Sequence, residues 1–282
     1  MKKSYLNKNR PQPYFDMIKD YFKEEIPWLY ILLKKCFYYL KYTIFTPPLD
    51  AVEIEINSFC NRKCRYCPNY DHTRERIFLE GNLFYKIIND LKKMKFKGAI
   101  TFNMYNEPLL DTRLSGFIEY VRKELPSAYI YLNTNGDLLN LHLWRKLRAS
   151  GLDFANVTQY DEKINDNIQH LLDELDLEEK KHIRAYLLHN VINRAGLVDN
   201  NSNVKLPLEK YCSRPFYQLS INYKGKAVLC CNDYFGLVEI ADVRNSSILT
   251  IWKNKIFKYY RKKLIFANRS GLKLCDKCDM FQ

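Results

Sequence analysis

Residues 51–67 read AVEIEINSFCNRKCRYC, and this stretch decides the fold. Its first part, AVEIEIN, alternates apolar and polar side chains and therefore predicts a strand over residues 51–57. Cys60, Cys64 and Cys67 follow with C-x3-C-x2-C spacing. The three thiols therefore stand together on the loop after this strand.

Strand and helix patterns alternate after this loop. Further strands are predicted over residues 99–104, 129–133, 154–158 and 183–188, and helices over residues 79–94, 113–125, 138–150 and 162–181. Strand–helix units repeated at roughly 25-residue spacing favour a parallel sheet with right-handed crossovers. We therefore predict an α/β fold, in which residues 51–203 form a partial (β/α)6 TIM-like barrel with its site at the C-terminal strand ends.

The two ends of the chain differ from this middle part. Residues 1–50 predict an N-terminal helical extension, with a helix over about 14–42 that Pro47 and Pro48 close. Its apolar run is far shorter than the ~20 residues of a membrane span. We expect it to pack on the barrel, and contact of residues 14–46 with a membrane surface is the less favoured alternative. Residues 204–282 predict a small C-terminal domain with a hairpin around 223–226 and an amphipathic helix that includes residues 251–264.

Charge and cysteine content narrow the class of protein. The 282 residues carry 45 Lys and Arg against 32 Asp and Glu, a net charge of +13, which excludes an acidic solvating protein. The nine cysteines are an odd number, and the first residues contain no apolar signal-peptide core, so a secreted disulfide framework is not expected. We expect a cytoplasmic protein whose clustered thiols bind metal. The basic C-terminal helix has no RNA-binding signature beside it, so no nucleic-acid partner is expected.

The first cysteine cluster favours iron over zinc. Three thiolates on a short loop can hold three irons of a cubane cluster and leave the fourth iron open for a substrate. Structural zinc requires four ligands, and His72 is poorly spaced to be the fourth.

The motif resembles that of the radical S-adenosylmethionine enzymes. Tyr105-Asn106-Glu107-Pro108 resembles the family's G-G/N-E-P segment, although Tyr105 stands where glycine is usual, and residues 133–136, NTNG, resemble its T-N-G turn. The resemblance implies a [4Fe–4S] cluster on the three cysteines, with S-adenosylmethionine chelated to the open iron. It further implies that Glu107 contacts the methionine ammonium and that the Tyr66 backbone contacts adenine. The full set of cofactor-binding residues that we expect is Tyr66, Asn106, Glu107, Thr134 and Asn135. The Thr134 and Asn135 side chains suit ribose hydroxyls, and turn formation is the alternative explanation for both.

A second cysteine set lies in the C-terminal domain. Cys212, Cys230 and the pair Cys275 and Cys278 resemble a SPASM domain or its shorter twitch form. The resemblance implies one auxiliary [4Fe–4S] cluster without an open iron, which makes two clusters in all. Cys231 is the alternative to Cys230, and zinc is the alternative to the cluster.

A few weaker candidates follow the later strands. Arg194 comes after the fifth strand, where twitch enzymes place an arginine near substrate, and it is the predicted catalytic residue; as a permanent cation it would act as a hydrogen-bond donor. A solvent-exposed loop arginine is the alternative. Tyr160, Asp161 and His189 also lie at predicted strand ends, and structural roles are favoured for them.

These features together predict a radical S-adenosylmethionine oxidoreductase. It would form a 5′-deoxyadenosyl radical, remove a hydrogen atom from a sugar or aminocyclitol alcohol, and pass the substrate electron to the auxiliary cluster. Modification of a ribosomally made peptide is the alternative, weakened because residues 1–50 are too short for a winged-helix leader-binding domain. A reducing partner such as flavodoxin or ferredoxin is expected. A non-catalytic electron carrier is disfavoured, since a carrier gains nothing from an open iron.

Overall fold

The computed structural model describes residues 26, 29, 46–161, 163–188 and 191–280, and the chain divides into residues 1–45 and residues 46–282. The predicted N-terminal helix over residues 14–42 therefore lies outside the described residues, apart from isolated positions. All elements with described bounds belong to the second unit.

Strands and helices alternate through most of this unit. The strands are β1 (Ala51–Ile54), β2 (Ala99–Thr101), β3 (Tyr129–Thr134), β4 (Phe154–Gln159), β5 (Ile183–Leu187), β6 (Gln218–Ile221), β7 (Lys226–Val228) and β8 (Glu239–Asp242). The α-helices are α3 (Gly81–Lys93), α4 (Leu114–Glu124), α5 (Leu141–Ala149), α6 (Asp166–Glu174), α7 (Leu177–Lys180), α8 (Arg214–Tyr217), α9 (Ile248–Trp252) and α10 (Lys255–Leu264). Short 3-10 helices are η1 (Pro108–Leu110), η2 (Arg194–Gly196) and η3 (Cys275–Lys277).

The described strands form one sheet in the order β5-β4-β3-β2-β1-β6-β7-β8. Strands β1 to β6 pair in parallel, whereas β7 and β8 are antiparallel additions at one edge. The predicted α/β class with a barrel-like parallel sheet is confirmed. The sixth parallel strand, β6, pairs with β1 on the side away from β2. It comes from residues predicted to belong to the C-terminal domain, so the sheet continues from the predicted barrel into that domain.

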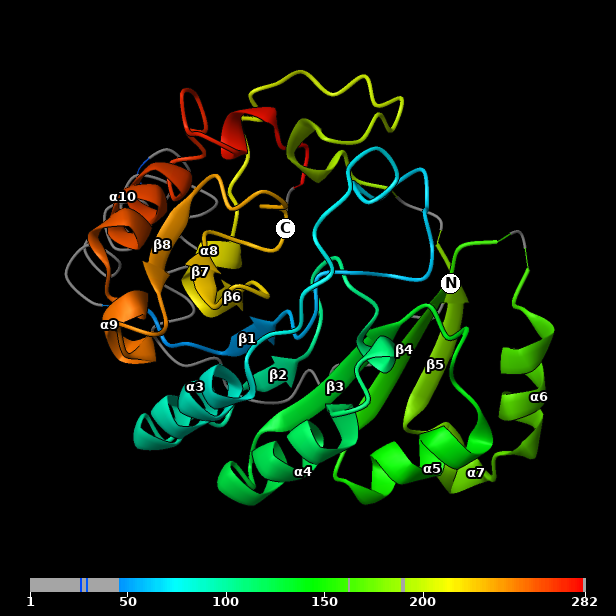
Figure 1. Cartoon of the computed structure of the whole chain (residues 1–282). Helices are drawn as coiled ribbons and strands as arrows, with labels where there is room; N and C mark the ends of the chain where they lie inside the picture. Colours follow the sequence, from blue (N-terminus) through cyan, green and yellow to red (C-terminus); the bar gives the residue numbers. More distant parts are fainter. Residues whose placement is uncertain (1–25, 27–28, 30–45, 162, 189–190, 281–282) are drawn as a thin grey trace. The chain divides into compact units, whose positions relative to one another are not determined.

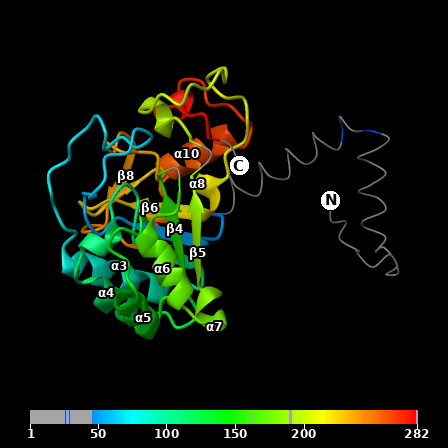
Figure 2. The same cartoon turned by 90° about the vertical axis from the view of Figure 1, so that its right-hand side faces the viewer.

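Side-chain alternation decides which face of the sheet the helices cover. Val52 and Ile54 of β1, and Ile130 and Leu132 of β3, are fully buried. Helices α3 to α7 pack along this side and occupy the lower half of Figure 2, while α8 and α10 lie in the upper half. The alternate residues, which are mostly polar, face the other side of the sheet, where the long loops gather (Figure 1).

Two predicted helices needed correction, and one strand was missed. The helix predicted over 162–181 is broken, because Leu175 is extended and Asp176 starts α7 with a capping box completed by Glu179. The helix predicted to include residues 251–264 is likewise split into α9 and α10, since the Asn254 side chain accepts a hydrogen bond from the Ile256 N–H and begins a new helix. Strand β8 was not predicted, because Glu239–Asp242 is too short to show a period. The predicted hairpin is confirmed as β6 and β7.

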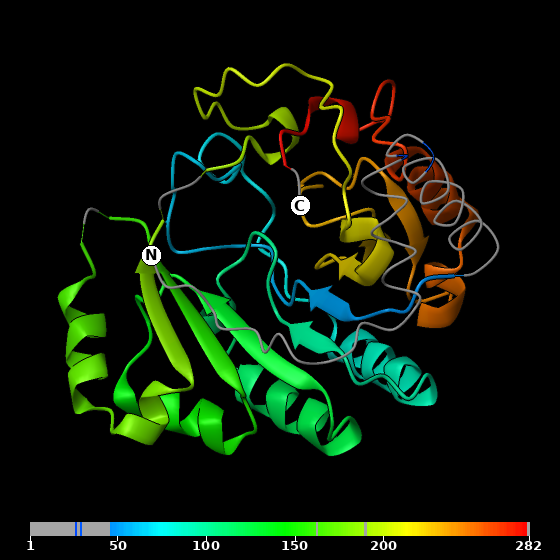
Figure 3. The same cartoon turned by 180° about the vertical axis from the view of Figure 1, so that it is seen from behind.

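The functional residues gather on one side of this framework. The loop after β1 (cyan), the segment after β5 (yellow-green) and the C-terminal segment (red) lie together at the top of Figure 1, and the view from behind in Figure 3 agrees. Asn193 and Asp279 tie two of these segments, because each residue's backbone N–H donates to the other's side chain, at 2.9 and 3.2 Å.

Candidate functional site

The loop after β1 brings its three cysteines to one cavity. Cys60, Cys64 and Cys67 are half-buried and line it together, and the Cys67 N–H donates to the Cys64 carbonyl at 2.9 Å to form the turn between them. Among the described residues, no fourth cysteine and no histidine lines this cavity. Burial raises the pKa of the Cys64 thiol to about 11 and raises that of Cys60 and Cys67 also. Thiols in such a place become thiolates only beside strong positive charge, as a bound iron cluster supplies.

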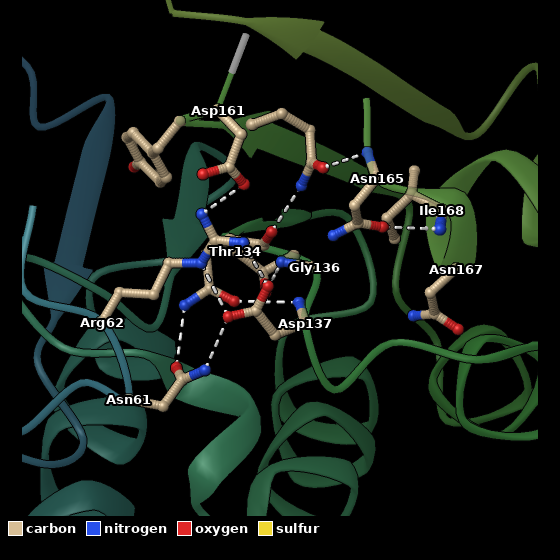
Figure 4. Close-up of polar contacts among 12 residues, drawn as sticks. Asn61, Arg62, Thr134, Gly136, Asp137, Asp161, Asn165, Asn167 and Ile168 are labelled. Atoms are coloured by element: carbon tan, nitrogen blue, oxygen red, sulfur yellow. Dashed lines mark hydrogen bonds and ion pairs between the residues drawn. The ribbon is translucent and has the colours of Figure 1, made fainter. Parts of the chain in front are cut away.

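Ion pairs fix the loop to the ends of β3 and β4. The Arg62 guanidinium binds Asp137 at 2.5 Å and Asp161 at 2.9 Å. The Asn61 amide donates to Asp137 at 2.8 Å and accepts a hydrogen bond from Asn135 at 2.8 Å, as Figure 4 shows for Asn61, Arg62, Asp137 and Asp161. The cysteine loop is therefore held by the strand ends as well as by its own turn.

Glu107 follows β2 and is almost completely buried, at 2% exposure. Its carboxylate accepts hydrogen bonds from the Thr134 hydroxyl (2.7 Å), the Asn135 N–H (2.8 Å) and the Leu109 N–H (3.0 Å). Burial raises the pKa of Glu107 to about 7, although these hydrogen bonds lower it. No cation of the described residues pairs with it, so its ionised form is suited to a ligand that brings a positive charge.

The other predicted cofactor contacts have protein partners of their own. Thr134 and Asn135 hold Glu107, and their side chains also close the turn at Gly136 and Asp137. Asn106 accepts from the Met104 N–H and donates to the Phe102 carbonyl, so its amide shapes the segment before Glu107. All three residues line the cavity, and their contact with a cofactor stays a prediction.

Aromatic residues and Arg194 complete the cavity wall. The Tyr66 ring stacks on Tyr160 at 5.4 Å between centroids, and its hydroxyl donates to the Tyr160 carbonyl at 2.9 Å. Arg194 lies 5.9 Å from the centre of the Tyr105 ring, and its Nε is buried without an acceptor among the described residues. Its backbone has a φ of 49°, a strained value for arginine. The predicted candidate His189 lies outside the described residues.

The second cysteine set surrounds a separate cavity. Cys212, Cys230, Cys275 and Cys278 all line it, together with Arg269. Burial raises the pKa of Cys230, Cys275 and Cys278. Four cysteines on one cavity match the number of ligands that a cluster fully coordinated by protein needs.

Cys231 points elsewhere. It does not line the second cavity, and its sulfur accepts a hydrogen bond from the Arg214 guanidinium. Burial raises the pKa of Cys231 to about 12. This placement supports Cys230, and not Cys231, as the ligand of the auxiliary cluster. The assignment stays a prediction.

Sequence reasoning missed the residues that anchor the cysteine loop. Arg62 stands between two of the cysteines, and Asp137 directly follows the NTNG turn. Their positions within and directly after the two motifs marked them as neighbours of the site, but not as partners of each other. Asp161, a weaker candidate for which a structural role was favoured, contributes an ion pair.

Two features are absent from the described residues. No three His, Cys, Asp or Glu side chains there are spaced to hold a single metal ion. No helix there has the length and apolar character that crossing a bilayer requires.

Family models match both halves of the site. Residues 54–183 match the radical SAM superfamily, where SAM is S-adenosylmethionine. Residues 212–279 match SPASM, described as an iron–sulfur cluster-binding domain. The first cysteine set lies within the radical SAM match, and the second set lies within the SPASM match.

Curated proteins and solved structures show the same relationship. The S-adenosyl-L-methionine-dependent 2-deoxy-scyllo-inosamine dehydrogenase of Niallia circulans is 28% identical over 234 residues, which cover 82% of this chain and 92% of that protein. The crystal structure of BtrN in complex with AdoMet and 2-DOIA matches with a TM-score of 0.76 and 28% identity, covering 82% of this chain and 93% of the other. A cofactor-modifying protein for the tungsten-containing aldehyde ferredoxin oxidoreductase of Pyrococcus furiosus is 29% identical over 102 residues, 36% of this chain and 28% of that protein.

Proposed function

Because the chain belongs to the radical SAM superfamily and carries a SPASM domain, we propose that it dehydrogenates an alcohol group of a sugar or aminocyclitol. The observation that carries this proposal is the similarity to the 2-deoxy-scyllo-inosamine dehydrogenase, which extends over both domains and over 92% of that protein. The chain is a radical SAM enzyme. Its radical SAM domain implies a [4Fe–4S] cluster that binds S-adenosylmethionine, and its SPASM domain implies auxiliary iron–sulfur binding.

The donor sets fit these groups. Cys60, Cys64 and Cys67 would hold the first cluster, and the second set, Cys212, Cys230, Cys275 and Cys278, would hold the auxiliary cluster. When bound, these groups would supply a 5′-deoxyadenosyl radical that takes a hydrogen atom from the alcohol carbon, and an acceptor for the electron that the substrate radical gives up once its hydroxyl proton has left to solvent.

The protein's own residues would bind and orient S-adenosylmethionine and the substrate. Glu107 would receive the methionine ammonium, because its buried carboxylate has hydrogen-bond donors on one side and no cation among the described residues. Arg194 would donate a hydrogen bond to a substrate oxygen, because its Nε has no acceptor among the described residues and the residue lines the cavity. Tyr66 and Tyr160 would exclude water from that side by their stacked rings.

The test is anaerobic reconstitution followed by incubation with S-adenosylmethionine, dithionite and single substrates. The panel holds 2-deoxy-scyllo-inosamine, neutral cyclitols, free sugars and a peptide library. We expect 5′-deoxyadenosine and a ketone in equal amounts with a polyol. A ketone-free reaction, or 5′-deoxyadenosine that forms only with peptides, would overturn the proposal in favour of peptide modification.

A further inference from the structure

A row of polar side chains crosses the cavity side of the sheet. Asn133 of β3 lies in register with Asn156 of β4, and Asn156 lies in register with Arg184 of β5. Their neighbours along β3 and β4, such as Leu132 and Ala155, are fully buried on the helix side. The row therefore faces the other way, and Asn103 and Asn133 line the cavity itself.

Hydrogen bonds run through the row in one direction. Arg184 donates to Asn156 Oδ1 (2.9 Å), the Asn156 amide to Asn133 Oδ1 (3.1 Å), and the Asn133 amide to Asn103 Oδ1 (3.1 Å). The Thr101 hydroxyl donates to the same Asn103 oxygen at 2.6 Å. An asparagine amide can face either way, but a guanidinium has only donors. Arg184 therefore sets the direction of every amide in the row.

The direction of the hydrogen bonds decides which group of Asn103 is left free to bind a ligand. Its carbonyl oxygen is taken by two protein donors, so its NH2 group remains, and among the described residues that group has no acceptor. Hydrogen bonds in series also strengthen one another. We propose that the Asn103 NH2 group donates a hydrogen bond to an oxygen of the polyol substrate, and that Arg184 is the positioning residue that makes Asn103 a donor. The inference rests on the proposed function and deepens it by assigning a specificity residue.

The position along the strand favours substrate over S-adenosylmethionine as the acceptor. Asn135, which contacts Asn61 and Cys60 of the cysteine loop, directly follows the end of β3 and stands two residues beyond Asn133 along the chain. Two residues of a strand span about 7 Å. Asn133 therefore lies about that far from Asn135, in the direction away from the cysteine loop, where a second reactant would have its place.

The test is a double-mutant cycle on the reconstituted full chain. Arg184→Glu replaces a donor by an acceptor, so the row reverses and Asn103 turns its oxygen to the cavity. Asn103→Leu removes the amide altogether. With 2-deoxy-scyllo-inosamine, each single change should raise KM roughly fivefold to tenfold, as expected for one lost hydrogen bond. The double variant should match Asn103→Leu alone, because Arg184 acts through Asn103.

Controls separate this explanation from general damage. Arg145→Glu makes the same charge change at an outer helix, where Arg145 pairs with Glu179, and should leave KM unchanged. Iron content and the Kd for S-adenosylmethionine should stay near wild type in every variant, and thermal unfolding should stay cooperative, with a lower midpoint in Asn103→Leu because the Thr101 hydroxyl loses its acceptor. Should Arg184→Glu not fold, Asn156→Asp replaces it, because an aspartate keeps the contact to Arg184 and still reverses the amides beyond it.

The outcomes are distinct. Absence of wild-type turnover of any polyol would defeat the proposed function. Wild-type turnover with additive increases in KM would defeat only the role of the row, as would an unchanged KM in Arg184→Glu. A weakened Kd for S-adenosylmethionine with an unchanged KM would move Asn103 to the cofactor and overturn the inference.

Discussion

The substitution Glu107→Gln tests the cofactor site most directly. Glu107 Oε1 accepts two hydrogen bonds, from Thr134 and Leu109, and Oε2 accepts one, from the Asn135 N–H. A glutamine keeps its single oxygen where two donors meet. Its NH2 group then faces the Asn135 N–H, donor against donor, and the negative charge is gone.

Two free-energy terms set the size of the effect. Loss of a charge-assisted hydrogen bond to the methionine ammonium costs about 1.5–3 kcal/mol. Since 1.4 kcal/mol corresponds to a factor of ten, the affinity for S-adenosylmethionine should fall about 10- to 100-fold. The unpaired Asn135 N–H should also lower the free energy of unfolding by about 1–3 kcal/mol.

The pH dependence gives a second, independent signature. Burial raises the pKa of Glu107 to about 7, so in the free wild-type protein the carboxylate gains a proton as the pH falls through that value. Only the ionised form attracts an ammonium, so wild-type affinity should rise as the pH rises through about 7, and should stop rising once the methionine ammonium itself deprotonates at about pH 8. Glutamine does not titrate, so this step should be absent from the variant.

Anaerobic titration calorimetry with S-adenosylmethionine over a pH series measures both signatures. Glu80→Gln is the matched control, because it makes the same chemical change at an exposed carboxylate that pairs with Arg244 at 2.6 Å. Iron content must match among the three proteins. Wild-type affinity in the Glu107→Gln variant, or a pH step that survives the substitution, would refute the assignment of Glu107 to the ammonium.

Three further predictions follow, two of them from the structure and the third from the sequence. Cys230→Ala should reduce the iron content from about eight to about four per chain, whereas Cys231→Ala should keep about eight, as measured after anaerobic reconstitution; the reverse result would make Cys231 the ligand. Arg62→Ala removes the ion pairs with Asp137 and Asp161 that hold the cysteine loop, so iron loss to a chelator should become several-fold faster, and an unchanged rate would make the anchor irrelevant. Residues 14–42 are expected to pack on the barrel, so the intact protein should not co-sediment with anionic vesicles at physiological salt, and co-sedimentation would favour a surface anchor.

Local pattern accounts for what the sequence could predict. The period of two in β1 and β3 and the helical stripes between strands indicated the parallel sheet, because each element buries one side against the other. The spacing of Cys60, Cys64 and Cys67 on one loop indicated the first thiol set. The second thiol set and the role of Glu107 were indicated by the resemblance to the radical S-adenosylmethionine enzymes and their SPASM domain.

Contacts between distant segments were beyond this reasoning. The Arg62 ion pairs need the loops after β3 and β4 to meet the cysteine loop, and nothing near Arg62 in the sequence encodes that meeting. The polar row needs the register of Asn156 against Asn133, and a shift by one residue would turn either side chain to the helix face. Strand β6 was recognised, but its partner β1 could not be known from its own residues.

The charges of the cavity bear on substrate class more than the net charge of the whole chain does. The net charge of +13 fits any anionic partner, yet few of those charges line the cavity. Arg62 is neutralised by Asp137 and Asp161, which leaves Glu107 and Arg194 as the lining charges without an ion-pair partner among the described residues. Because Glu107 would be paired with the methionine ammonium, Arg194 is the lining charge left for the substrate, and one guanidinium beside a thiolate loop that adds negative charge does not compensate a phosphate dianion. This lining suits an uncharged polyol or one that carries an amine, and phosphorylated sugars added to the panel should therefore be poor substrates.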